Sequence, residues 1–138
     1  MTTPAGPLPG GAQDVPEPVF ECAEDWVAGY FLPMFRRPVG GEFRWCPRWW
    51  AHPEAVSRLT ALWRSWEAFR LEPSSGISDW YGGHLDHHLP ILLGSRGPFF
   101  QCDPAGGHID ADPFPVEDVD YDADAAGDGD TPGAGAVT

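Results

Sequence analysis

Two cysteine–histidine pairs with equal spacing are the residues of this sequence best suited to chemistry. Five residues separate Cys46 from His52, and five residues separate Cys102 from His108. Together the pairs offer two thiolates and two imidazoles, which is a ligand set of tetrahedral structural zinc sites. The spacing is longer than in common zinc modules. A simpler interpretation therefore stays open, in which the cysteines are small buried residues and His52 caps the following helix.

A second group of histidines lies at His84-Leu85-Asp86-His87-His88. His84 offers an alternative nitrogen to the zinc site. Histidine and carboxylate ligands with an open coordination position can activate a bound water, so the group allows a small metal-dependent hydrolase. However, its order differs from the His-x-His-x-Asp-His pattern, and a solvated helix face explains it as well. No phosphate loop, nucleophile elbow or Cys-His-acid arrangement is present, so no catalytic residue is assigned and an enzyme is the weaker expectation.

Four arginines, Arg36, Arg37, Arg44 and Arg48, alternate with phenylalanine and tryptophan. Arginine interleaved with aromatic residues is typical of surfaces that bind single-stranded nucleic acid. Against this, the formal net charge of −13 is opposite to the basic footprint of nucleic-acid binders. Stacking of these arginines on tryptophans within the domain is the alternative interpretation.

Charge and the content of proline and glycine divide the chain into three parts. Nine of the 21 acids follow His108, whereas all eight basic residues are arginines between Arg36 and Arg96. Residues 1–19 are rich in proline and glycine, and residues 109–138 add like-charge repulsion to the same composition. We expect a disordered leader over 1–19, a small tryptophan-rich domain over 20–108, and a disordered acidic tail over 109–138.

Apolar periodicity predicts a mainly α fold. Helices are expected at Glu24–Phe35, at Pro53–Leu71, and from Ser78 or Asp79 to Leu92, the last frayed or broken at its glycines and Pro90. Pro47 leaves residues 43–50 irregular or at an edge. The sequence thus predicts a small three-helix domain with short irregular or extended segments.

The sequence indicates a cytoplasmic protein without a membrane span. No run of apolar residues is long enough to cross a bilayer, and the start MTTPAGPLPGG lacks the basic and apolar regions of a signal peptide. Cys22, Cys46 and Cys102 are an odd number of cysteines, which favours reduced thiols or metal ligands over disulfides.

Several ordered blocks carry a family resemblance. They are WCPRWW at 45–50, HPEAV at 52–56, ALWRSWE at 61–67 and GPF at 97–99. Over residues 25–108 the chain resembles an uncharacterised family of small actinobacterial proteins, a domain of unknown function often encoded on mobile elements. The resemblance implies no activity. It does imply that a common pattern includes the positions Cys46, His52, His84, Cys102 and His108.

These observations favour a non-enzymatic accessory or adaptor module that binds a protein partner. A mobile element as its source and a structural zinc at Cys46, His52, Cys102 and His108 are open additions to this interpretation. One alternative is a nucleic-acid-associated regulator whose arginine patch is masked by the acidic tail. A small metal-dependent hydrolase is the other. The oligomeric state stays open.

Overall fold

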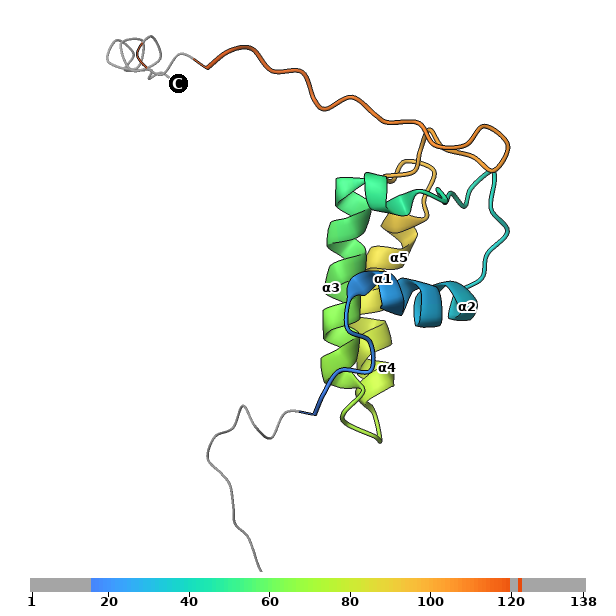
Figure 1. Ribbon diagram of the computed structural model, residues 1–138, viewed down its shortest axis with the longest axis vertical. Helices are drawn as coiled ribbons and strands as arrows, with labels where there is room; N and C mark the ends of the chain where they lie inside the picture. The colour runs from blue at the N-terminus through green and yellow to red at the C-terminus, as the bar shows by residue number, and fades with distance from the viewer. Residues whose placement is uncertain (1–15, 120–121, 123–138) are drawn as a thin grey trace, which may run out of the picture.

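The computed structural model describes residues 16–119 and residue 122. Three helical stretches form the domain (Figure 1), as the sequence predicts. The first consists of α1 (Ala23–Trp26), a π-helical turn (Val27–Phe31) and α2 (Leu32–Met34). The second is α3 (Pro53–Phe69), which follows a 3-10 turn at Trp49–Ala51. The third consists of α4 (Gly76–Trp80), a π-helical turn (Tyr81–Leu85) and α5 (Asp86–Leu92).

Helix α3 is the longest element and carries the amphipathic pattern that predicts it. Pro53 occupies the first turn, where its fixed φ angle suits a helix and its missing N–H is not needed. Ala55, Leu59, Leu62 and Trp66 recur every three or four residues and are buried. The helix ends at Phe69, two residues before the predicted end.

The third helical stretch differs from the prediction in two respects. It begins at Gly76, earlier than predicted. A Cβ atom at this position would lie 1.9 Å from the Phe69 carbonyl oxygen, so a larger residue would clash with the end of α3. It is also continuous, because the predicted break at Gly82 and Gly83 is a π-helical turn instead. Pro90 is tolerated inside α5 because it lies on the solvent side of the helix.

Aromatic side chains fill the core between the three stretches. Helix α3 lies beside α4 and α5, and the first stretch crosses this pair (Figure 1). Trp26 is fully buried at the crossing, with its ring centroid 6.2 Å from that of Trp80 and 6.4 Å from that of Trp66. The indole N–H of Trp80 donates to Ser65 Oγ at 2.9 Å, so this buried donor is satisfied.

Residues just before the predicted domain contact it. The backbone N–H groups of Val19 and Phe20 donate to the Glu67 carboxylate at 3.0 and 2.9 Å, and Arg70 donates to the Glu17 carbonyl. Residues 1–15 of the expected leader, and residues 120–121 and 123–138 of the expected tail, lie outside the described residues. Within the described part, no helix has the length and apolar content that a membrane crossing requires.

Candidate metal centre

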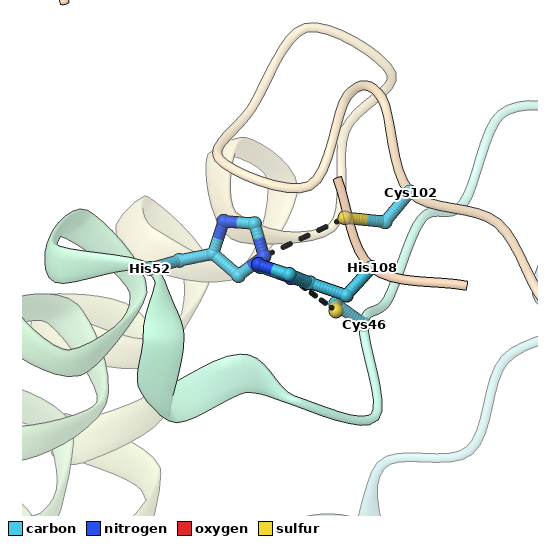
Figure 2. A group of neighbouring side chains, drawn as sticks. All are labelled: Cys46, His52, Cys102 and His108. Atoms are coloured by element: carbon cyan, nitrogen blue, oxygen red, sulfur yellow. Dashed lines mark hydrogen bonds between the residues drawn. The ribbon is translucent and has the colours of Figure 1, made fainter. Parts of the chain in front are cut away.

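The two cysteine–histidine pairs meet at one point of the fold (Figure 2). One ligand atom from each of Cys46, His52, Cys102 and His108 lies within 4.8 Å of all the others. Cys46 Sγ is 3.3 Å from His108 Nδ1, and Cys102 Sγ is 3.5 Å from His52 Nε2. Each short contact therefore joins a cysteine of one pair to a histidine of the other.

The first pair is positioned by the irregular segment before α3. The backbone N–H of Arg44 donates to the Leu93 carbonyl at 2.8 Å, which fixes this segment against the end of α5. The 3-10 turn at Trp49–Ala51 then reverses the chain, so Cys46 and His52 face the same space. His52 is the N-cap residue of α3, but its side chain forms no capping hydrogen bond. His52 therefore occupies the predicted capping position, but its side chain does not cap the helix.

A tight turn positions the second pair. Asp103 and Gly107 form an antiparallel bridge, and the Asp103 carboxylate accepts the backbone N–H of Gly106. Gly107 has a φ of 81°, a conformation that glycine adopts without strain. Because the chain reverses between them, Cys102 and His108 lie side by side.

The aromatic ring of Phe99 closes the centre from the protein side. Phe99 is fully buried, and its ring meets the edge of the His52 ring at a centroid distance of 5.0 Å. Cys46 and Cys102 are also fully buried, and His52 is 6% exposed. The candidate ligands are thus largely removed from water.

Burial shifts the pKa values of the cysteine and histidine side chains of the cluster when no metal is bound. Burial raises the pKa of the Cys46 thiol, and the adjacent Cys102 raises it further, although the backbone N–H of Arg48 acts in the opposite sense. Burial and the neighbouring His108 lower the pKa of His52, against the opposing influence of Asp110. Neutral imidazoles are the form that metal ions bind, whereas two adjacent thiolates need a cation to offset their charge.

Further contacts hold the second pair in orientation. The Asp110 carboxylate lies 2.6 Å from His108 Nε2, the ring nitrogen that faces away from Cys46. The backbone N–H of Ile109 donates to Cys102 Sγ at 3.3 Å. A carboxylate behind a ligating histidine and N–H donors to a sulfur are typical of the outer shell of metal sites. Sequence reasoning missed both residues, although their positions one and two residues after His108 were a usable signal.

The comparison with protein families gives a match over most of the domain. Residues 20–120 match the family described as Domain of unknown function (DUF4913). The chain belongs to this family. Neither the curated proteins nor the solved structures compared with it include a match.

The DUF4913 domain keeps its other histidines away from the cluster. His84 packs against Phe69 with a ring-centroid distance of 4.8 Å, so it is not the alternative fourth ligand. His88 Nδ1 lies 3.0 Å from a guanidinium nitrogen of Arg58. Within the described residues, Asp86 and the histidines around it form no group with metal-ligand spacing.

The four arginines of the predicted patch do not stack on aromatic rings in the described part of the DUF4913 domain. The cation–π contacts there are those of Arg64 over Trp63 and Arg70 over Trp66, at 6.0 and 5.9 Å from the ring centroids. The stacking interpretation is therefore wrong for Arg36, Arg37, Arg44 and Arg48. The first three of these instead line an apolar hollow, together with Phe43 and Trp45.

Proposed function

We propose that Cys46, His52, Cys102 and His108 bind one Zn²⁺, and that the protein is a zinc-stabilised, non-enzymatic adaptor module for a protein partner. The spacing of the four ligand atoms carries the proposal. Sulfur and nitrogen ligands at the corners of a tetrahedron around zinc lie about 3.3 to 3.8 Å apart. The two cysteine–histidine contacts, at 3.3 and 3.5 Å, fall in this range. The other distances between the four ligand atoms are at most 4.8 Å. Binding of zinc would shorten the longest of them by about 1 Å.

A structural role for the metal follows from the number and charge of its ligands. Four protein ligands fill a tetrahedral shell, so no position remains for an activated water. Two thiolates and two neutral imidazoles also bring the total charge of a zinc complex to zero. A neutral complex suits a buried site, because an uncompensated charge there would be costly.

The position of the centre explains what the metal would stabilise. Residues 43–52 and 99–108 contain no extended strand pairing and are joined by few backbone hydrogen bonds. A domain of this length has a small core, and a bound metal is a common means of stabilising such domains. Zinc would tie both irregular segments to the start of α3 and leave the helices free to present a binding surface.

Zinc content tests the proposal directly. The full chain, expressed with zinc in the medium and purified without chelator or affinity tag, is expected to contain one zinc per molecule by elemental analysis. Cobalt in place of zinc should give the absorption of four-coordinate Co²⁺ with thiolate charge-transfer bands. Removing the metal with a chelator should lower the melting temperature.

Matched variants separate ligands from bystanders. Cys102→Ser should lose zinc, whereas Cys22→Ser should keep it, because Cys22 lies outside the cluster. In the same way His52→Ala should lose zinc and His84→Ala should keep it. A chain that binds no zinc and melts at the same temperature with and without chelator would contradict the proposal.

A further inference from the structure

An apolar hollow beside the first helical stretch is edged by arginines. It is a cavity of about 240 Å³ between the end of α2 and the segment that follows it. Its apolar walls include Phe31, Phe43, Trp45 and Leu93. Arg36, Arg37 and Arg44 also line it. We call this hollow the arginine groove.

The guanidinium groups of the arginine groove have hydrogen-bonding capacity to spare. Arg36 Nε donates to the Pro33 carbonyl at 2.9 Å, and Arg44 Nε donates to the Gly41 carbonyl at 2.8 Å. Among the described residues, Arg37 donates to the neighbouring Arg36 carbonyl at 3.0 Å. Within residues 16–119, the ion pairs formed by arginines involve Arg58 and Arg70, and none involves these three. Their remaining N–H donors suit carboxylates, while the walls suit apolar side chains.

The chain itself contains a segment with the complementary chemistry. In residues 112–119, which we call the acidic segment, Phe114 is 95% exposed and Val116 is 84% exposed. Glu117 and Asp118 lie between Val116 and Val119. Large apolar side chains with this exposure gain free energy when they are buried, and the neighbouring carboxylates match the arginines in charge.

The acidic segment leaves its own domain in a direction that leads away from the arginine groove. Asp110 is held by His108, and Ile109 is held by Cys102, so the chain just before the acidic segment is fixed at the metal centre. Residues 110–114 then pass the start of α3, where they line a second hollow with Pro53 and Phe100. In Figure 1 this segment runs above the start of α3 and away from α2. Docking into its own groove would cost these contacts, whereas docking into another molecule would not.

We propose that the arginine groove of one copy binds the acidic segment of a second copy. The inference rests on the adaptor role proposed above and names a second copy of this chain as the partner. Phe114 and Val116 enter the apolar part of the groove, and the carboxylates of the segment pair with Arg36 and Arg37. Because the interaction is largely between exposed charges, salt weakens it.

Complementation between two full-length variants tests this inference. Sedimentation velocity of the wild-type chain should show a mass that rises with concentration at low ionic strength and less so at high ionic strength. R36Q/R37Q damages the groove and F114S/V116S damages the segment, and each variant alone should stay monomeric. An equimolar mixture should associate again, because one variant supplies an intact segment and the other an intact groove.

The control is an arginine outside the groove. R37Q should weaken association about fivefold, which is the scale of one exposed ion pair. R64Q removes an exposed arginine of α3 and should leave association unchanged. Zinc content is measured on every sample, so a wild-type chain that holds zinc and stays monomeric would overturn this inference and leave the proposed metal centre intact.

Other outcomes would also overturn it. A mixture of the two variants that fails to associate, although the wild type does, would contradict exchange between molecules. A monomeric wild-type chain whose arginine groove is covered by its own acidic segment would also contradict exchange between molecules. Binding of a single-stranded oligonucleotide that R36Q/R37Q abolishes would assign the groove to nucleic acid instead.

Discussion

Cys102 Sγ lies 3.5 Å from His52 Nε2, so the loop after α5 meets the first residue before α3. The two residues are 50 positions apart in the chain. The contact between Cys46 and His108 spans 62 positions and closes the same cluster. The candidate metal centre therefore joins the two irregular segments at one end of the helical pair, as Figure 2 shows.

Loss of the carboxylate behind His108 should weaken zinc binding without abolishing it. We expect Asp110→Asn to lower zinc affinity by about tenfold, because outer-shell partners of ligating histidines typically contribute this much. Competition with a chromophoric chelator measures the change. Asp112→Asn is the control, since Asp112 is exposed and the His108 ring pairs with Asp110 instead. Equal affinities of the two variants would show that Asp110 does not support the metal.

The glycine at the start of α4 should resist substitution. A Cβ atom at Gly76 would lie 1.9 Å from the Phe69 carbonyl oxygen, so Gly76→Ala must move backbone of α3 or α4. We expect the free energy of unfolding to fall by about 1 to 3 kcal/mol, as for other substitutions that overpack a core. Urea denaturation followed by circular dichroism measures this loss.

Gly82 provides the opposite case in the same helical stretch. A Cβ atom there would meet nothing within 4 Å, and Gly82 is exposed. Gly82→Ala should therefore raise the free energy of unfolding by roughly 0.5 to 1 kcal/mol, because alanine loses less backbone entropy on folding. A loss of stability in Gly82→Ala as large as in Gly76→Ala would refute the steric explanation.

The pH dependence of stability should include a contribution from Glu67. Burial acts to raise the pKa of this carboxyl, but the N–H groups of Phe20 and Val19 and the Arg70 guanidinium outweigh it, so the pKa lies below 4.5. A depressed pKa in the folded state contributes stability that is present above pH 4.5 and is lost as pH falls through the folded pKa. At neutral pH we expect Glu67→Gln to cost about 1 to 3 kcal/mol.

The difference between wild type and Glu67→Gln isolates this contribution from other titrations. It should be constant above pH 4.5 and shrink in more acidic solution, as thermal or urea melts across pH would show. Glu54→Gln is the control, because Glu54 forms an exposed ion pair with Arg58 on the same helix. Such pairs contribute little, so its effect should stay below about 0.5 kcal/mol. A stability difference between wild type and Glu67→Gln that grows as the pH falls would contradict the lowered pKa of Glu67.

Ser65 should matter because it satisfies a buried donor. The Trp80 indole N–H donates to Ser65 Oγ at 2.9 Å and lies 3.3 Å from the Leu62 carbonyl oxygen. Removing the hydroxyl in Ser65→Ala leaves only the longer contact, and we expect a loss of about 1 kcal/mol in urea melts. Ser57→Ala changes an exposed serine of α3 and should have little effect.

The sequence by itself determined the helices and named the four candidate ligands. The period of apolar residues along α3 is a local property, and so are the proline at its start and the repeated five-residue spacing of the cysteine–histidine pairs. The family resemblance also came from short local blocks, and the match over residues 20–120 confirms that the chain belongs to a family of unknown function. Where local patterns were ambiguous the prediction was less accurate, as with Gly82 and Gly83, which a π-helical turn accommodates.

Tertiary structure alone decided which residues meet. Spacing cannot bring together residues separated by 50 or 62 positions, because that depends on how the helices pack and on the turn at Asp103–Gly107. Packing also placed His84 against Phe69, away from the cluster, and gathered Arg36, Arg37 and Arg44 around an apolar hollow. The physical reason is that local patterns fix the conformation of a segment, whereas a site made by several segments depends on long-range burial, which only the folded chain specifies.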